Sequence, residues 1–393
     1  MDVLRSKRFG CQNLKTASLE LLNCPYCGSN LSIKHTIEQE YEKIIAGSVK
    51  CDCSEYPILE GILILKDYAL NEQVIELLEV GKKEEAIIRY LGSDSFEALN
   101  TFEKSISLPH PFPQKISHIL GQSTSRLAKL MIEPRYKRLF KIYSDETLSF
   151  YDSMGNDRYS TYFKQRFSSE SLWSVYPFVP LLIKKKERIL DLSCGAGHAS
   201  FILDKYVKPK EHFATDYSFR NLFLAKKFFA PNAEFICIDA NQALPFKEGT
   251  FSSILMLDAF HCIRSRASLA REMKRTLCNS GLLLVLHNHN PLTYNLGGEF
   301  SVPTRNLYEV FADRSLIVKI VPENKILNDF LFRDVINLGK KFDAKQLDHS
   351  NATILVATSD ESIFTKHYVL DHFLSAENNL IINPIYEIEK KKI

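Results

Sequence analysis

Apolar residues fall into short runs from about residue 187 onward, and longer amphipathic segments separate these runs. Such runs predict buried strands, because a strand covered on both faces needs apolar side chains at nearly every position. The predicted strands are 188–193, 211–216, 234–239, 251–257 and 281–287. Their alternation with helical segments is typical of a parallel sheet that carries helices on both faces.

Two later apolar runs, 316–321 and 352–357, predict strands that close this sheet. The segment between them, at about 324–347, has helical spacing and predicts a helical insertion. The predicted fold class is therefore α/β, with a Rossmann-like seven-stranded sheet. We expect this domain to span residues 171–393, with its core at 187–290.

The part of the chain that precedes this domain shows two other patterns. Short apolar runs separated by Pro and Gly predict a small β-rich module over residues 1–69. Residues 70–170 have apolar positions at helical spacing, broken by the proline-rich stretch 108–113, and predict a helical connector with a kinked linker. A chain of 393 residues accommodates this many units, since one domain takes about 100–200 residues.

Composition narrows the class of protein. Apolar residues make up 45% and charged residues 25% of the chain, as in an ordinary globular protein. The net charge of +3 is too small for the broad positive field of a nucleic-acid binder, so RNA or DNA is not favoured as a partner. No apolar run reaches the ~20 residues of a membrane helix, and the N-terminus does not have the pattern of a signal peptide. We therefore expect a cytoplasmic protein with reduced cysteines and no membrane partner.

A glycine turn follows the first predicted strand. The strand ends in Ser193-Cys194-Gly195-Ala196-Gly197, and an apolar helical stretch comes next. Glycines let the backbone turn tightly and let a ligand approach it, while the helix offers free N–H groups. Asp216 and Asp239 are further evidence for a ligand site at this turn. They end the second and third strands, where doubly wound sheets bind their ligands.

This ordered set resembles the class I S-adenosylmethionine-dependent methyltransferases. The resemblance implies that Asp191 orients the amino acid end of S-adenosylmethionine and that Gly195 and Gly197 form the turn beneath it. It also implies that Asp216, followed by Tyr217, binds the ribose, and that Asp239 with the backbone of Ala240 reads the adenine. Ser193 stands where the family more often has glycine. A nicotinamide-binding domain is not favoured, because the third glycine of its fingerprint is missing.

Few residues are needed for the transfer itself, because the methyl group of a sulfonium is already activated. His261 and Asp258 lie just past the fourth strand and are the candidate catalytic residues, His261 as a general base. The alternatives are a histidine that only packs and an aspartate that caps the strand end. His287 and His289 alternate at the end of the fifth strand and could share a metal, but no third ligand is evident. Substrate contact or hydrogen bonding is therefore the preferred interpretation for that pair.

A helical segment before the first strand supplies the lid. Tyr159, Tyr162 and Arg166 share one of its faces by their spacing. Resemblance to the family implies that such a segment closes over the cofactor, so Tyr162 and Arg166 are candidate cofactor-binding residues. Arg166 would then pair with the carboxylate of the cofactor. The alternative is a solvated arginine beside core tyrosines.

Four cysteines near the N-terminus have the spacing of a zinc site. Cys24 and Cys27 have two residues between them, and Cys51 and Cys53, with one residue between them, supply a second, tighter pair. The four candidate ligands predict a structural zinc ion, and the alternative is a β-rich module without metal. The segment resembles the small zinc-binding activator subunit of tRNA and protein methyltransferases, which implies a zinc-ribbon-like module carried in the same chain.

The sequence thus predicts an S-adenosylmethionine-dependent methyltransferase. We expect the lid and the insertion to enclose a substrate pocket above the core. The favoured acceptor is an oxygen or nitrogen atom of a small metabolite, a natural-product intermediate or a peptide. The alternatives are an RNA or protein methyltransferase and a catalytically silent binding protein that keeps the cofactor fold. The pattern contains no indication of the oligomeric state.

Overall fold

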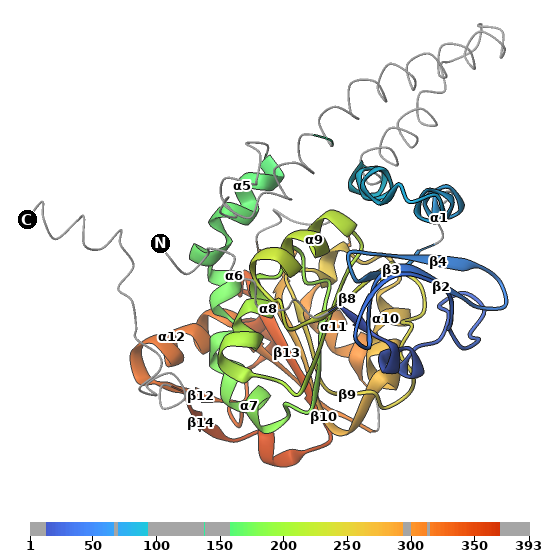
Figure 1. The fold of residues 1–393 in the computed structure, drawn as a ribbon. Helices are drawn as coiled ribbons and strands as arrows, with labels where there is room; N and C mark the ends of the chain where they lie inside the picture. The colour runs from blue at the N-terminus through green and yellow to red at the C-terminus, as the bar shows by residue number, and fades with distance from the viewer. Residues whose placement is uncertain are drawn as a thin grey trace, which may run out of the picture.

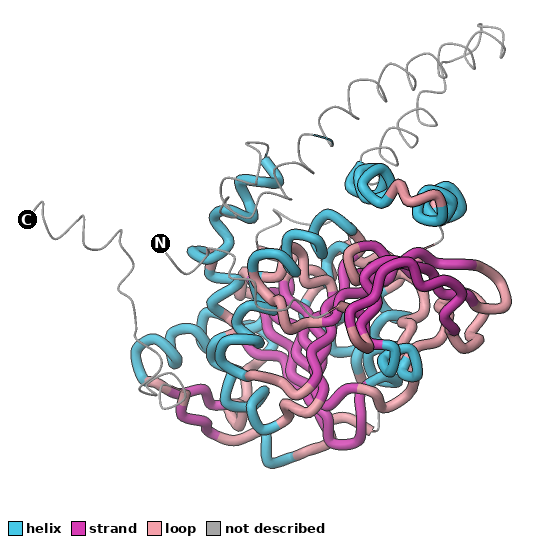
Figure 2. The backbone as a smooth tube through the Cα atoms, viewed as in Figure 1, coloured by secondary structure: helices cyan, strands magenta, loops and turns pink. Residues whose placement is uncertain are grey.

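The computed structural model describes residues 13–66, 70–92, 137, 158–293, 300–312 and 315–369. Its centre is one large twisted sheet flanked by helices on both faces (Figure 1). Figure 2 shows the strands running through the middle of the molecule and the helices around them. This three-layer arrangement confirms the predicted α/β class.

Seven strands form the part of the sheet that the sequence predicts. In spatial order they are β8 (Glu234–Ile238), β7 (Glu211–Asp216), β6 (Arg188–Leu192), β9 (Phe251–Leu257), β10 (Leu277–His289), β13 (Ala352–Thr358) and β11 (Ile317–Pro322). The first five pair in parallel, and the last two pair antiparallel with their neighbours. Nearly every residue of the central strands is buried, which explains why their sequence lacks an alternating polar face.

Helices cover both faces of this sheet. Buried side chains of α7 (Val179–Lys184), α8 (His198–Ile202) and α12 (Glu323–Arg333) pack on one face over β6, β9 and β10. On the same face α9 (Phe219–Phe228) packs farther along the sheet. The opposite face is covered by α10 (Arg266–Thr276) and α11 (Thr304–Phe311). Short helices α5 (Arg158–Gln165) and α6 (Glu170–Trp173) lead into the first central strand.

The N-terminal module continues the same sheet. Its strands are β1 (Leu14–Lys15), β2 (Ser32–Glu40), β3 (Lys43–Lys50), β4 (Glu55–Leu59) and β5 (Ile62–Leu65). β5 pairs in parallel with β8, so the sheet reaches twelve strands (Figure 1). Without this pairing β8 would be an exposed edge with unpaired backbone groups. The predicted β-rich module is therefore present, and it is joined to the α/β part through backbone hydrogen bonds.

Two segments between the predicted units differ in detail from the expectation. The insertion contains α12 and α13 (Ala344–Asp348), and between them the short strand β12 (Val335–Asn337) pairs with β14 (Lys366–Tyr368). It is thus helical at its ends only. Of the connector, α1 (Asn71–Glu79) and the helical residues 83–92 pack against the module, whereas the proline-rich stretch lies outside the described residues. The division of the chain into three units stays a prediction.

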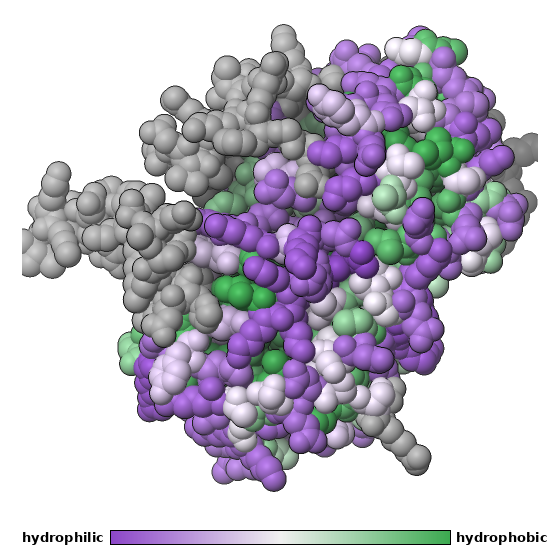
Figure 3. Space-filling model, turned by 60° about the horizontal axis from the view of Figure 1, so that its bottom comes forward, coloured by the Kyte–Doolittle hydropathy of each residue, from purple (hydrophilic) through white to green (hydrophobic). Residues whose placement is uncertain are grey.

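One face of the molecule is mostly polar (Figure 3). Figure 3 shows a face on which hydrophilic residues predominate and hydrophobic residues form small groups. Among the described helices, none combines the length and the apolar character that crossing a membrane requires.

Candidate functional site

A cavity of about 830 Å³ opens at the carboxyl ends of the central parallel strands. This is where the loops of a doubly wound sheet leave room for a ligand. The cavity is lined by Tyr162, Arg166, Asp191, Ser193, Gly195, Asp216, Tyr217, Asp239, Ala240, Asp258 and His261, which the sequence singled out, and also by His287 and His289. Of the predicted cofactor-binding and catalytic residues, only Gly197 is absent from this lining.

Positive φ angles shape the turn after β6. Ser193, Gly195 and Gly197 have φ of 61°, 56° and 89°. A Cβ atom on Gly197 would lie 2.6 Å from Cβ of Ala225 on α9, so this glycine permits close packing of α8 against α9. A Cβ on Gly195 would meet the ring of Phe163 at 3.0 Å. Gly195 therefore faces the cavity and α5, and Gly197 lies on the other side of the turn, against α9.

Asp216 holds the same turn from the neighbouring strand. One carboxylate oxygen, Oδ2, accepts a hydrogen bond from the backbone N–H of Gly195 at 2.9 Å. The other, Oδ1, accepts bonds from the N–H of Ser218 at 2.9 Å and from Nδ2 of Asn221 at 3.0 Å. The end of β7 and the turn after β6 are thus tied together through one side chain.

Asp191 lies beneath the turn and is fully buried. Its Oδ2 accepts a hydrogen bond from the hydroxyl of Ser200 at 2.6 Å, whereas Oδ1 has no hydrogen-bond partner among the described residues. Burial raises the pKa of this carboxyl to about 6. An incomplete set of partners on a buried carboxylate is the property expected of a group that awaits a polar ligand.

Asp239 and Tyr217 form the far side of the cavity. Oδ1 of Asp239 accepts bonds from the backbone N–H and the Nδ2 of Asn241, at 2.9 and 3.0 Å. The Tyr217 ring is 41% exposed, and Nζ of Lys66 lies 3.4 Å from its centroid. The same Nζ donates to the backbone oxygen of Tyr217 at 2.5 Å. Lys66, at the end of the N-terminal module, therefore supports a wall of the cavity, a contact that the sequence did not suggest.

Asp258 is the centre of a polar network at the other end. Its Oδ2 accepts a bond from Nη1 of Arg166 at 2.6 Å and from the hydroxyl of Tyr162 at 3.1 Å. Its Oδ1 lies 3.0 Å from Nε2 of His289. Burial alone would raise the pKa of Asp258, but the bond from His289 and the charges of His287 and Arg166 together hold that pKa well below its usual range. Tyr162 and Arg166, which precede the first central strand, thus reach the carboxylate at the end of β9.

Two more histidines complete this end of the cavity. The rings of His261 and His289 lie 4.1 Å apart, and Nδ1 of His261 is 4.0 Å from Oδ1 of Asp258. Burial and the neighbouring His289 lower the pKa of His261 to about 4, so its imidazole is neutral at pH 7. His287 bonds through Nδ1 to Oε2 of Glu323 at 2.6 Å. Burial lowers the pKa of His287, but the bond to Glu323 outweighs it and raises that pKa above its ordinary value.

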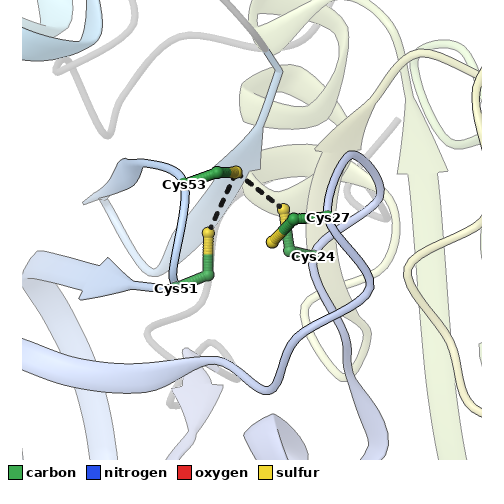
Figure 4. Close-up of side chains that lie close together, drawn as sticks. All are labelled: Cys24, Cys27, Cys51 and Cys53. Carbon is green, nitrogen blue, oxygen red and sulfur yellow. Dashed lines mark hydrogen bonds between the residues drawn. The ribbon is translucent and has the colours of Figure 1, made fainter.

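The four N-terminal cysteines converge as the sequence predicts (Figure 4). Cys24 and Cys27 lie on one loop, and Cys51 and Cys53 lie on the loop between β3 and β4. Sγ of Cys53 is 3.7 Å from Sγ of Cys24 and 3.4 Å from Sγ of Cys51. Tetrahedral zinc with bonds of about 2.3 Å holds its sulfur ligands about 3.8 Å apart, so the residues fit such an ion.

The part of the chain that forms most of this site matches a known family. Residues 190–285, from β6 to β10, match the family model described as a methyltransferase domain. The chain contains a methyltransferase domain. The glycine turn, Asp216, Asp239 and Asp258 all lie within the matched residues.

Two named methyltransferases are similar in sequence to part of this chain. Demethylmenaquinone methyltransferase of Thermotoga maritima is 29% identical over 133 residues, which are 34% of this chain and 57% of that protein. Phthiotriol/phenolphthiotriol dimycocerosates methyltransferase 1 of Mycobacterium ulcerans is 28% identical over 99 residues, 25% of this chain and 36% of that protein. The chain thus spans a little over half and about a third of the length of these relatives.

Solved structures of methyltransferases overlap with about half of the chain. One comes from the complex of the Haloferax volcanii Trm112 methyltransferase activator with a methyltransferase, at 14% identity, with 52% of this chain and 99% of that chain covered and a TM-score of 0.38. Another is a SAM-dependent methyltransferase from Aquifex aeolicus, at 18% identity, with 52% and 98% covered and a TM-score of 0.36.

Proposed function

We propose that this protein binds S-adenosylmethionine in the cavity and transfers its methyl group to an oxygen or nitrogen atom of a small molecule. The observation that carries the proposal is that Asp191, Asp216 and Asp239 line one cavity together with the glycine turn. Single acids often end strands, but three of them at successive strand ends share one cavity here. A silent binding protein would have no reason to keep this set together.

The residues fit the cofactor in distinct ways. The unpartnered Oδ1 of Asp191 is an acceptor for the ammonium group of the amino acid end. Asp216, at the end of β7, accepts bonds from the ribose hydroxyls, and the carboxylate of Asp239 accepts a bond from the adenine amino group. The exposed ring of Tyr217 offers a face against which an adenine can stack. When bound, S-adenosylmethionine supplies an activated methyl group.

Removal of a proton from the methyl acceptor is the step that side chains of the protein must carry out. His261 lines the cavity as a neutral imidazole, so it can accept a hydrogen bond or a proton from an acceptor hydroxyl or amine. Asp258 accepts a hydrogen bond from Arg166 and lies against His289, so it can hold both side chains in place. That Asp258 acts in catalysis and that Arg166 pairs with the cofactor stay predictions.

The size of the cavity favours a small acceptor. A volume of about 830 Å³ lies within the range of about 300–1,000 Å³ that small-molecule sites occupy. The named relatives are called demethylmenaquinone and phthiotriol/phenolphthiotriol dimycocerosates methyltransferases, which supports a small molecule as acceptor. RNA or protein methylation remains the alternative, and the net charge of +3 does not favour RNA.

The four cysteines are assigned to a structural zinc ion. Four thiolates close the coordination shell, so such an ion would hold the two loops together and would not react. The backbone N–H of Tyr26 points to Sγ of Cys24 at 3.4 Å, and Gly28, directly after Cys27, turns the loop with φ of 76°. The ion would thus stabilise the module whose strand β5 completes the large sheet.

The experiment that tests this function uses S-adenosylmethionine labelled in its methyl group. The full-length protein is incubated with hydroxylated quinones and with a metabolite extract, and labelled products are identified by mass spectrometry. A labelled small molecule that disappears with Asp239→Asn supports the proposal. Label transferred only to added RNA or protein, or no transfer by protein that binds the cofactor, contradicts it.

A further inference from the structure

Two histidines and an aspartate at one end of the cavity have the composition of a metal site. Asp258 follows β9, and His287 and His289 lie at the end of β10. One ligand atom of each lies within 4.8 Å of those of the other two. We propose that this cluster binds a divalent transition-metal ion, separate from the cysteine site. The sequence had supplied the two histidines without a third ligand, and the fold brings Asp258 to them.

The two oxygens of Asp258 face different groups. Oδ2 is engaged with Arg166 and Tyr162, whereas Oδ1 is directed to Nε2 of His289 at 3.0 Å. Adjacent ligand atoms on an octahedral ion with bonds of about 2.1 Å are also about 3.0 Å apart. Oδ1 and Nε2 are therefore already spaced as neighbouring ligands, and Arg166 and Tyr162 hold the carboxylate in that orientation from outside.

His287 has the outer partner that metal-bound histidines usually have. Its Nδ1 lies 2.6 Å from Oε2 of Glu323, at the start of α12. When Nδ1 carries the proton for this bond, Nε2 presents its lone pair to an ion. Glu323 is 4% exposed, and its Oε1 has no hydrogen-bond partner among the described residues. A buried carboxylate that contacts one histidine is better accounted for when that histidine holds a cation.

Charge and backbone geometry agree with this assignment. Asp258 and Glu323 bring two carboxylates to the cluster, against the single guanidinium of Arg166. Asp258 and His287 also have φ of 53° and 54°, in the left-handed region that non-glycine residues rarely adopt. The strand pairing shifts register between Val285 and Asn288, next to this point. Such departures cluster at ligand sites, where surrounding contacts enforce them.

The donor set indicates the class of ion and of ligand. Two imidazoles and one carboxylate suit zinc, ferrous iron or cobalt better than magnesium or calcium, and they leave coordination positions open. All three side chains line the cavity, so open positions would accept oxygen atoms of an entering molecule. Binding of the methyl acceptor through the ion rests on the proposed function, and it favours substrates with two neighbouring oxygens. Binding of the ion itself does not depend on methyl transfer.

The test is a titration with Co²⁺ of full-length protein that has been loaded with one equivalent of zinc per chain, so that the four cysteines hold zinc and the second cluster is free. Zinc is quantified on the same sample, so that exchange at the cysteines is detected, and thiolate ligation has a distinct optical spectrum. The expected result is one bound cobalt ion per chain with the spectrum of nitrogen and oxygen ligands. His289→Ala and Asp258→Asn are expected to weaken cobalt binding at least about tenfold, and Glu323→Gln about 10–100-fold. His35→Ala, an exposed histidine on β2, is the matched control and should bind cobalt like the unchanged protein.

Titration of S-adenosylhomocysteine on the same samples reports folding and keeps the two proposals apart. Cobalt binding without cofactor binding would support the metal site and contradict methyl transfer. Folded protein that binds S-adenosylhomocysteine but takes up no cobalt beyond its zinc would overturn the metal site, and the histidines would then form a hydrogen-bond network. Equal cobalt affinity in His289→Ala, Asp258→Asn and the unchanged protein would overturn it as well.

Discussion

Replacing Asp216 and Asp239 by asparagine, one at a time, is expected to separate support of the fold from recognition of the cofactor. Asp216 uses both oxygens as acceptors, one for Gly195 and the other for Ser218 and Asn221. An asparagine at 216 must turn its NH2 group toward one of these donors, whichever way the amide is oriented. At least one bond is therefore lost and a donor is left without an acceptor.

Asp239 differs because only one of its oxygens has partners. Oδ1 accepts both bonds from Asn241, and no described residue donates to Oδ2. An asparagine can keep its amide oxygen at the position of Oδ1 and place its NH2 group where Oδ2 was. The local structure then survives, while the acceptor facing the proposed adenine site becomes a donor.

The magnitudes follow from the number of bonds affected. Hydrogen bonds to charged groups contribute about 1.5–3 kcal/mol, and a buried unsatisfied donor costs about 1–3 kcal/mol. Asp216→Asn is therefore expected to lower the free energy of unfolding by about 2–4 kcal/mol, and Asp239→Asn by less than about 1 kcal/mol. Loss of one charge-assisted bond to the ligand corresponds to binding that is about 10–100-fold weaker for Asp239→Asn.

Urea unfolding followed by circular dichroism measures the first effect, and calorimetric titration of S-adenosylhomocysteine measures the second. Similar losses of stability in the two variants would contradict the hydrogen-bond reasoning. Unchanged affinity of Asp239→Asn for S-adenosylhomocysteine would refute the assignment of Asp239 to the adenine.

Three other predictions concern residues in the cavity or directly behind its lining. The pKa of Asp191 in the folded protein, about 6, lies above its ordinary value of 3.8, so ionisation of this carboxyl opposes folding. The free energy of unfolding should fall by about 3 kcal/mol as pH rises from about 4 to 7, and urea unfolding of Asp191→Asn should lack this fall. Gly197→Ala should cost about 2–5 kcal/mol in thermal unfolding, because it combines a left-handed φ with a steric clash, whereas Gly81→Ala, with φ of 76° and open space, should cost about 1–2 kcal/mol. Lys66→Met should weaken binding of S-adenosylhomocysteine about 3–10-fold through loss of its bond to the loop after β7, and Lys34→Met, at an exposed ion pair, should leave that binding unchanged.

The cofactor side of the cavity was predictable because it depends on local order. Asp191, Asp216 and Asp239 each lie in or at the end of an apolar run, and parallel strands bring their carboxyl ends to one edge. Strand positions alone therefore place these residues together. The same reasoning predicted the strands themselves, since burial on both faces leaves a continuous apolar run.

The other side of the cavity depends on contacts between distant segments, which no local pattern reveals. Arg166 and Asp258 are 92 residues apart, and His287 and Glu323 are 36 residues apart. The residue types were visible in the sequence, but their partners were not. Pairing of β5 with β8 is another such contact, because an apolar strand gives no indication of which edge it joins.

The most direct measurement is calorimetric titration of S-adenosylhomocysteine into the purified full-length protein, with Asp239→Asn as the paired sample. The proposed function predicts one site per chain with micromolar affinity, and weaker binding by the variant. Folded protein that binds no S-adenosylhomocysteine would contradict the proposal and favour a scaffold that has kept the fold without the cofactor.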